Sequence, residues 1–438
     1  MNRLLLCIAL LLVFPAISFA QSFDWPQWRG PNGDGTSAET GWNPLALKDG
    51  AKVLWNVNIG FGYSNVAIQG NRLYAMGLSE GDVYICCLDA TTGRVIWRQQ
   101  PFQESCFPQT TPAVAGESVY FLSSRGSLIC VKASDGKVLW ERDFKYDFGA
   151  LSQPYLWASS PIVEGDLLLL SANGKALALD RRTGDLAWDV DVISPVSTSP
   201  RHVDYGVYAT PVLHDFEGVQ CALFLGPHTI SAIESKTGRK VWSFELRKAW
   251  SLEGESDLLI IDPFIVEGNV FINGNIFDTS TGVLLDASVS PPSLAVKYTE
   301  APNSWPHPVL SNGFLYGSVC PRNLPLTGSW GAFEQADHQF ICMAVKSGEV
   351  MWRKQIGWSS SILVAGKLVT LELNGTLHIA EATPEGYREL SSADVLGGAK
   401  KARVFATPPV LCNGKIYCHN FAGELVCIDV SKSISPGE

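Results

Sequence analysis

The stretch that decides the fold is LDATTGRVIW, from Leu88 to Trp97, because variants of it recur along the chain. An apolar run leads into a Thr-Gly or Asp-Gly turn, and a β-branched run ending in Trp leads out of it. Glycine supplies the positive φ that a tight turn requires, so each copy predicts a hairpin whose Trp packs on the neighbouring unit. Further copies are VKASDGKVLW (Val131–Trp140), LDRRTGDLAW (Leu179–Trp188), IESKTGRKVW (Ile233–Trp242) and AVKSGEVMW (Ala344–Trp352).

Three other segments complete the set of repeats. FDTSTGVLLD (Phe277–Asp286) places Asp286 at the Trp position, and EATPEGYREL (Glu381–Leu390) places Leu390 there. An eighth outgoing strand, GAKVLWNVNI, carries Trp55 but has no incoming strand before it. We therefore expect structural packing by the repeat tryptophans, which are Trp55, Trp97, Trp140, Trp188, Trp242 and Trp352.

A second element keeps the same period of roughly 50 residues. It is a short strand opened by Ser/Thr-Pro, as in TTPAV around Pro112 and SSPIV around Pro161, and eight such openings or variants occur. Each unit is then four antiparallel strands that cannot bury both faces alone, which favours radial stacking. The sequence predicts an all-β fold, an eight-bladed β-propeller of four-stranded antiparallel blades. An N-terminal strand around Trp55 completes the C-terminal blade and closes the ring.

The cysteines follow the repeat. Cys87, Cys130, Cys342 and Cys427 share one register in the third strand, where Ala178 and Ala232 stand in other blades. Where two sheets face each other closely, only a small buried side chain fits. We therefore interpret these four cysteines as packing residues rather than redox centres. No pairing is predicted for Cys106, Cys221, Cys320, Cys412 or Cys418.

The N-terminal sequence and the net charge limit where the protein can act and what it can bind. Arg3, an apolar run from Leu4 to Phe14 and a small-x-small site at Ser18–Ala20 predict a cleaved signal peptide and a periplasmic or secreted protein. The expected division is 1–20 signal peptide, 21–48 strap across one propeller face, 49–433 propeller and 434–438 tail. A net charge of −10 argues against nucleic acid or anionic membrane as partner. No later segment predicts a transmembrane span, and we expect a monomer.

The LDATTGRVIW-type unit resembles the PQQ-like repeat of the quinoprotein alcohol dehydrogenase-like superfamily. The same repeat occurs in the non-enzymatic BamB propeller of the bacterial outer-membrane assembly machinery. The opening WPQWRGP, Trp25 to Pro31, resembles the start of exported planctomycete propeller proteins. The resemblance implies the fold, and because the repeat is a packing device it does not by itself imply an activity.

The opening stretch FDWPQWRGPNGDG lies before the closing strand, so it must cross one face of the disc. We expect Trp25 and Trp28 to anchor between blades and Arg29 to reach towards the axial channel. Asn32 to Gly35 predicts a turn, and its acidic oxygens are too few for a calcium loop. A structural clasp is the favoured interpretation, and no metal site is predicted.

Long interblade connections gather on one face and carry aromatic and charged residues, as a binding face requires. The candidate binding residues are Trp25, Trp28, Arg29, Tyr155, Trp157, Arg201, His202, Tyr205, Trp250, Trp305 and His307. The alternative for each is packing under its own loop. Arg201, His202 and Asp204 are consistent with an acid–base cluster or, more simply, with a loop salt bridge.

Two functions remain. The first is a non-catalytic exported scaffold whose loops bind a protein, peptide or glycan, with no cofactor and no catalytic residues. The second, implied by the resemblance, is a PQQ-dependent oxidoreductase acting on an alcohol or sugar, with calcium. The enzymes' calcium ligands have no clear match here. Their vicinal disulfide occupies a loop, whereas Cys86 and Cys87 lie in the strand run VYICCLDA. The first function is therefore favoured.

Overall fold

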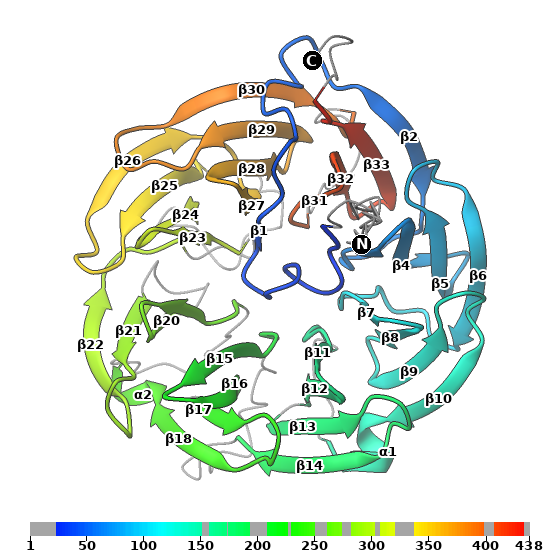
Figure 1. The fold of residues 1–438 in the computed structure, drawn as a ribbon, viewed down its shortest axis with the longest axis vertical. Coiled ribbons are helices and arrows are strands. Elements are labelled where there is room, and N and C mark those ends of the chain that lie inside the picture. Colours follow the sequence, from blue (N-terminus) through cyan, green and yellow to red (C-terminus); the bar gives the residue numbers. More distant parts are fainter. Residues whose placement is uncertain are drawn as a thin grey trace, which may run out of the picture.

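The computed structural model is a ring of eight sheets seen end-on in Figure 1. It describes residues 23–150, 157–172, 174–192, 208–226, 229–249, 261–273, 282–302, 307–319, 337–397 and 407–432. The expected all-β, eight-bladed propeller is confirmed. Within these ranges the helical elements are short, α1 (Phe144–Phe148) and α2 (Leu246–Ala249), and no helix is long and apolar enough to cross a bilayer.

Each blade is built in chain order from its inner to its outer strand. Blade 1 is β3 (Ala67–Gln69), β4 (Arg72–Ser79), β5 (Asp82–Asp89) and β6 (Val95–Phe102). Blade 2 is β7 (Ala113–Ala115), β8 (Ser118–Leu122), β9 (Ser127–Lys132) and β10 (Val138–Asp143). Blade 3 is β11 (Ile162–Glu164), β12 (Leu167–Ser171), β13 (Lys175–Asp180) and β14 (Leu186–Asp191). Blade 4 is β15 (Val212–Phe216), β16 (Val219–Gly226), β17 (Thr229–Glu234) and β18 (Lys240–Glu245).

The second half of the ring follows the same order, with two additions from the N-terminus. Blade 5 is β19 (Phe264–Val266), β20 (Asn269–Asn273), β21 (Gly282–Asp286) and β22 (Ser293–Tyr298). Blade 6 is β23 (Val309–Ser311), β24 (Phe314–Val319), β25 (Gln339–Ala344) and β26 (Val350–Gln355). Blade 7 is β27 (Ser359–Val364), β28 (Lys367–Glu372), β29 (Thr376–Glu381) and β30 (Arg388–Asp394), with β1 (Thr36–Ser37) added in parallel to β27. Blade 8 is β31 (Val410–Cys412), β32 (Lys415–His419), β33 (Glu424–Asp429) and β2 (Val53–Asn58).

The ring is closed by the strand that the sequence left without a partner. β2 pairs antiparallel with β33, and Trp55 stands opposite Cys427. Figure 1 shows the blue β2 beside the red β33. Closure in this way pairs an edge that the C-terminal blade would otherwise expose. The predicted closure is confirmed.

The repeat tryptophans lock each blade to the next. The indole N–H of Trp97 donates to the Ala133 carbonyl in the following blade, 3.0 Å away, and a Cβ on Gly136 would lie 2.7 Å from the Trp97 ring. Equivalent bonds leave Trp55, Trp140, Trp188 and Trp352 for Ala90, Arg181, Ser235 and Thr383. At Trp55, Trp97, Trp140 and Trp188 the glycine turn of the next blade sits on the indole ring.

The degenerate repeats are partly reassigned by the structure. Asp286 does not hold the Trp position, because Gly282–Asp286 is the third strand of blade 5 and pairs with both β20 and β22. Tyr298 at the end of β22 packs under Gly348 and donates to the Val345 carbonyl, as the repeat Trp does elsewhere. In blade 7 the ladder position belongs to Ser391, opposite Ile379, rather than to Leu390.

The cysteine prediction is confirmed. Cys87, Cys130, Cys342 and Cys427 each face a Tyr of the second strand, and all four are fully buried. The described cysteines, Cys86 beside Cys87 included, are free thiols. Burial raises the pKa of Cys87 to about 11, so the thiol stays protonated and acts as a small core residue.

Candidate functional site

The positions that open the inner strands form a hydrogen-bonded belt around the axis. In each case a backbone N–H donates to the side chain at the same position in the next blade. The bonds are Asn65 to Thr111 (3.2 Å), Thr111 to Ser160 (2.9 Å), Ser160 to Thr210 (3.0 Å), Thr210 to Asp262 (2.7 Å) and Asp262 to His307 (3.2 Å). The Ser/Thr-Pro openings are thus explained, because the side chain accepts the bond and the proline follows with no N–H to satisfy.

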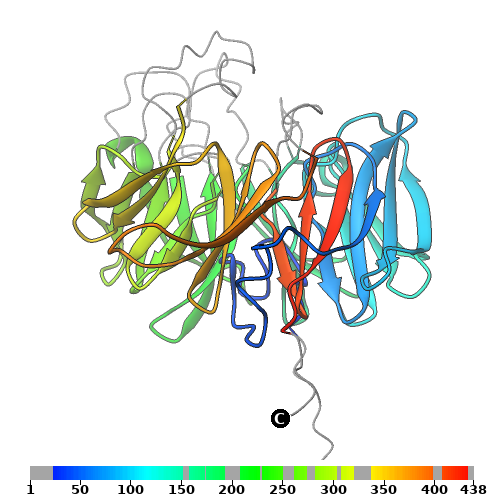
Figure 2. The same cartoon turned by 90° about the horizontal axis from the view of Figure 1, so that it is seen from above.

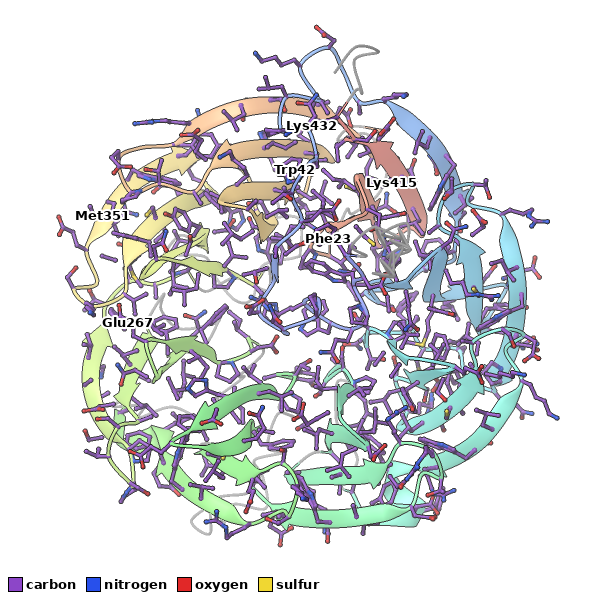
Figure 3. The ribbon with its side chains drawn as sticks, viewed as in Figure 1. Phe23, Trp42, Glu267, Met351, Lys415 and Lys432 are labelled. Carbon is purple, nitrogen blue, oxygen red and sulfur yellow. The ribbon has the colours of Figure 1, made fainter. Side chains whose placement is uncertain are left out.

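The N-terminal strap, described from residue 23 to residue 48, runs along the inner strands of most blades. Trp25 exchanges backbone bonds with Ile68 of β3 (3.0 and 2.7 Å), and further bonds link Pro26 to Val114, Gln27 to Val163, Gly35 to Leu363 and Glu39 to Asn413. Figure 2 shows this blue segment on one side of the disc, and Figure 3 places Phe23 and Trp42 within the ring. We name this side the strap face.

Two residues of the strap, Trp28 and Arg29, form a cluster with Asp262 and His307 of the inner-strand openings. We call this cluster the axial anchor. The Trp28 indole N–H donates to Asp262 Oδ2 at 2.7 Å, and Trp28 meets the His307 ring edge-on at 5.2 Å between centroids. His307 Nε2 lies 3.3 Å from the same carboxylate oxygen. Arg29 is buried and donates to the Pro308 and Asp34 carbonyls at 3.1 and 2.7 Å.

The axial anchor is a compensated charge cluster. Burial pushes the pKa of Asp262 upward, but His307, Arg29 and the Trp28 N–H outweigh it, so the pKa lies below its ordinary value. Burial lowers the pKa of Arg29, and the charges of Asp262 and Asp34 oppose that effect. Buried charges are tolerated when they are paired and hydrogen-bonded in this way. Trp25, Arg29 and His307 therefore lie in the interior of the described structure rather than on its surface.

The opposite side, which we name the loop face, carries the interblade connections and the turns between second and third strands. Here four rings from three connections form an aromatic patch, defined by Phe61, Tyr63, Phe107 and Phe421. Phe421 lies between the others, with centroids 6.0 Å from Phe61, 4.7 Å from Tyr63 and 5.0 Å from Phe107. Phe61 and Phe107 remain 48% and 40% exposed.

The backbone holds the aromatic patch rigidly. The Gly62 N–H donates to the Phe421 carbonyl at 3.1 Å, and the Tyr63 N–H donates to the Pro108 carbonyl at 2.8 Å. Gly62 packs so closely that a Cβ there would lie 2.9 Å from Pro108. Three blades thus meet at one point, where Phe61 and Phe107 are exposed and Tyr63 and Phe421 are half-buried.

The remaining candidates from the sequence fall into two groups. Trp157 is buried in the core beside Phe144, with ring centroids 5.0 Å apart. Tyr155, Arg201, His202, Tyr205, Trp250 and Trp305 lie outside the described residues. The structure thus joins two predicted regions, the strap and the segment at His307, in the axial anchor.

Sequence reasoning missed Asp262 and the aromatic patch. Asp262 precedes Pro263 at a position filled by Ser or Thr in most other blades, and that exchange was a usable signal. Phe61 stands between Gly60 and Gly62, outside any repeat position, which was a weaker one. Phe107 and Phe421 are single aromatic residues in short connections and carried no periodic signal.

Comparisons with known proteins agree with this architecture. Residues 45–223 and 157–383 match a family described as outer membrane protein assembly factor BamB. BamB of Yersinia pestis is 22% identical over 254 residues, covering 53% of this chain and 59% of that protein, so the chain matches somewhat over half the length of this relative. Crystal structures of Moraxella catarrhalis BamB (14% identity, TM-score 0.58, 87% and 98% coverage) and Comamonas testosteroni quinohemoprotein alcohol dehydrogenase (13%, 0.67, 95% and 82%) share the fold.

The second structural relative raises the question of a quinone cofactor with calcium. Within the described residues no three His, Cys, Asp or Glu side chains converge as a metal-ligand set. Asp262, buried among the inner-strand openings, already accepts from Thr210 N through Oδ1 and from Trp28 through Oδ2. Cys86 and Cys87 are separate thiols inside β5. The described residues therefore do not fit a calcium-bound quinone.

Proposed function

We propose that this chain, which belongs to the BamB family of PQQ-like β-propellers, binds a segment of another protein on its loop face and catalyses no reaction. Family membership supports a scaffold role. The axial anchor supports it further, because Trp28 and Arg29 of the strap occupy contacts with Asp262 and the Pro308 carbonyl at the inner-strand openings. The alternative, a PQQ-dependent alcohol or sugar dehydrogenase, is favoured only by similarity of fold.

The single observation that carries the proposal is the aromatic patch. Exposed rings on a rigid backbone cost solubility without adding to the core, and such patches mark interaction sites. Rings that are already ordered lose little entropy on binding, which makes them effective anchors. Phe61, Phe107 and Phe421 offer no hydrogen-bonding group and Tyr63 offers only its hydroxyl, so we expect an apolar side chain of a peptide or protein rather than a glycan.

The proposed location is the periplasm or the extracellular space. This proposal rests on the signal-peptide pattern of residues 1–20, which lie outside the described residues. We further propose that the protein acts as a monomer and without PQQ.

The test is selection of short random peptides displayed on phage against the purified protein. We expect enriched peptides to share an aliphatic or aromatic anchor, and their affinity to fall at least tenfold in Phe61→Ser and Phe107→Ser, about 1.4 kcal/mol or more per truncated anchor. Val138→Ser is the matched control, because Val138 is 44% exposed on the outer strand β10, away from the loop face.

Two results would overturn the proposal. If the peptides bind the Phe61→Ser and Phe107→Ser variants as well as they bind the unaltered protein, the aromatic patch is not the binding site. Absence of any enriched sequence would remove peptide binding itself.

A further inference from the structure

Blade 7 departs from the repeat on the face that it turns towards blade 6. There Thr370 of β28 stands opposite His378 of β29. The same pair of positions in the other blades is mostly apolar or small: Ala75–Cys86, Phe121–Ile129, Leu170–Leu177, Phe224–Ser231, Ile272–Val283, Gly317–Ile341 and Cys418–Val426. A histidine at this position is therefore a specific feature of one seam.

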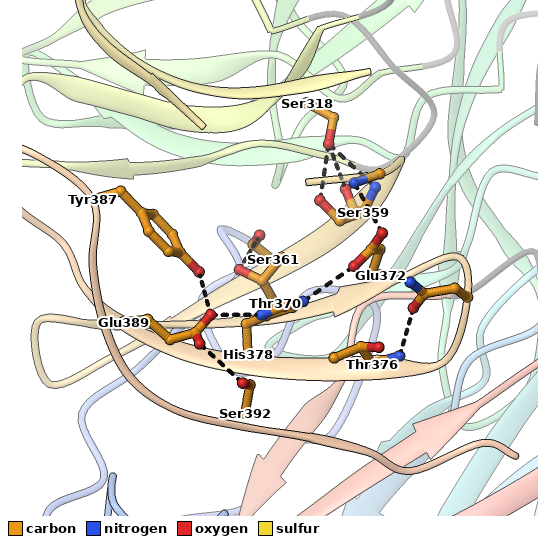
Figure 4. Close-up of polar contacts among 12 residues, drawn as sticks. Ser318, Ser359, Ser361, Thr370, Glu372, Thr376, His378, Tyr387, Glu389 and Ser392 are labelled. Carbon is orange, nitrogen blue, oxygen red and sulfur yellow. Dashed lines mark hydrogen bonds and ion pairs between the residues drawn. The ribbon is translucent and has the colours of Figure 1, made fainter. Parts of the chain in front are cut away.

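His378 lies between two carboxylates. Its Nδ1 is 2.8 Å from Glu389 Oε2, and its Nε2 is 3.2 Å from Glu372 Oε2 (Figure 4). The imidazole is largely buried, with 13% of the side chain exposed. The two nitrogens point from opposite edges of the ring, so one metal ion cannot take both nitrogens and both carboxylates.

Glu372 also contacts the connection that leads from blade 6, whereas Glu389 is linked to blade 6 only through Tyr387 of its own blade. Glu372 Oε1 accepts the Gly357 N–H at 3.0 Å, just before β27. Glu389 Oε2 accepts from the Tyr387 hydroxyl at 3.3 Å, and the Tyr387 ring packs edge-on against Trp352 of β26 at 5.7 Å. The position of His378 is thus coupled to the contact between two blades.

We propose that Glu372, His378 and Glu389 form a proton-operated clasp between blades 6 and 7, closed when His378 is protonated and loosened when it is neutral. A protonated imidazole donates to both carboxylates at once. A neutral imidazole carries one N–H, and the shorter contact places it on Nδ1, towards Glu389. The lone pair on Nε2 then faces Glu372 Oε2, and the two repel.

Loss of the bond between His378 Nε2 and Glu372 Oε2 also affects the backbone, because Glu372 accepts the Gly357 N–H through its other oxygen. Gly357 approaches so closely that a Cβ there would lie 2.4 Å from Glu372 Oε1. When Glu372 moves away from Nε2, the bond from Gly357 N–H lengthens and the start of β27 becomes less protected from solvent. The clasp therefore controls the end of the seam next to the loop face.

The charged and titratable groups around the clasp come from both blades. On blade 7 these are the two glutamates, Tyr387 and Glu385, and burial raises the pKa of Tyr387 well above its ordinary value. From blade 6, Lys354 lies 5.6 Å from the Tyr387 ring. Burial raises the pKa of Cys342 to about 11 and that of Tyr316 further still. A second described imidazole, His338 just before β25, stacks on Trp358 in the same seam at 5.9 Å between ring centroids, so the variant at His378 has to separate the two histidines.

Local electrostatics agree with the clasp. Burial alone lowers the pKa of His378, but the hydrogen bonds to Glu372 and Glu389 outweigh it, and the pKa is raised. A raised histidine pKa means that the clasp stabilises the fold fully below about pH 6.5 and loses that contribution as the pH rises through the folded-state pKa. The glutamates, whose pKa values are lowered, stay charged into the acid range.

The test is hydrogen–deuterium exchange of a peptide spanning Arg353 to Leu363, which contains the Gly357 amide, at about pH 5.5 and about pH 8, on either side of the ordinary imidazole pKa. After correction for intrinsic exchange rates, we expect protection to fall by about tenfold for each unit by which folding raises the His378 pKa. His378→Gln should remove this pH dependence. His214→Gln, on β15, is the matched control and should keep it.

The clasp is overturned if protection in the unaltered protein is equal at both pH values, or if His378→Gln retains the full pH dependence. A second measurement does not depend on that variant folding. NMR titration of the His378 ring should give a pKa above the ordinary value, and lower in Glu389→Gln. A His378 pKa at or below about 6.5 would refute the clasp.

Discussion

At the scale of single residues, Asp262 joins the strap to the belt around the axis. Its two oxygens accept from Thr210 N and from Trp28 Nε1. Its charge also opposes the burial-induced lowering of the Arg29 pKa more strongly than the charge of Asp34 does. Replacing it by Asn keeps the shape but leaves the buried Arg29 without the carboxylate that most offsets its burial. We predict that Asp262→Asn lowers the free energy of unfolding by about 3 kcal/mol, measured by denaturant titration.

The control for that substitution is Asp286→Asn, at the exposed end of β21, where the carboxylate caps only Ser288. It should leave the denaturation midpoint almost unchanged. If Asp262→Asn behaved like Asp286→Asn, the axial anchor would have no part in holding the strap.

Two glycines of blade 2 allow the free-energy cost of backbone strain to be measured separately from the cost of a packing clash. Gly136 (φ 74°) and Gly116 (φ 62°) both adopt the left-handed conformation, but only Gly136 faces the ring of a repeat Trp. A Cβ on Gly136 would lie 2.7 Å from Trp97, whereas a Cβ on Gly116 would meet nothing within 4 Å.

We therefore predict that Gly116→Ala costs about 1 kcal/mol for the backbone alone and that Gly136→Ala costs at least about 2 kcal/mol more. Thermal unfolding of the two variants side by side is the measurement. Equal losses would mean that the turn–tryptophan contact is loose enough to absorb a methyl group.

At the scale of elements, the strap and the closing strand have different tasks. A variant that begins at Ala51 lacks the strap but keeps β2, and one that begins at Tyr63 lacks both. We predict that the first still unfolds cooperatively at a lower temperature. The second should expose the edge of β33 and aggregate, since nothing replaces β2. Size-exclusion chromatography separates these outcomes, and a monomeric, cooperative second variant would contradict them.

The elements also show where sequence patterns suffice. Strand, turn and register could be predicted wherever glycine and Trp both mark the hairpin, because packing under the next blade requires both. Blade 5 was misassigned because Thr-Gly at 281–282 imitates the turn signal while the real turn follows Asp286. Tyr298 had taken over the packing of the missing Trp, and a tyrosine gives no such signal by itself.

The candidate site was harder to predict because its residues lie far apart in the sequence. Trp28 and Asp262 are separated by 234 positions, and only closure of the ring brings them together. The aromatic patch joins connections from blades 8, 1 and 2, and its phenylalanines occupy no repeat position. A pattern along the chain can find what repeats, whereas these residues matter because they break the repeat.

At the scale of the whole molecule, buried histidines set how stability depends on pH. Burial lowers the pKa of His419 in blade 8 to about 4. A lowered histidine pKa contributes stability above about pH 6.5 and loses it as the pH falls towards about 4, in all about 3 kcal/mol. Blade 1 has Met76 at the same position, opposite Ile85 as His419 is opposite Leu425. We predict that His419→Met flattens the acid limb of the melting-temperature profile, and an unchanged limb would contradict this assignment.

The central claim is that this propeller binds without a quinone cofactor. Thermal unfolding of the purified protein with saturating pyrroloquinoline quinone and calcium tests it, followed by dye reduction with alcohols and sugars. A ligand at a hundred times its dissociation constant would stabilise the fold by about 2.7 kcal/mol, a shift that is easily measured. We predict no shift in the melting temperature and no dye reduction. A calcium-dependent rise in melting temperature with turnover would contradict the claim and establish the chain as a quinoprotein oxidoreductase.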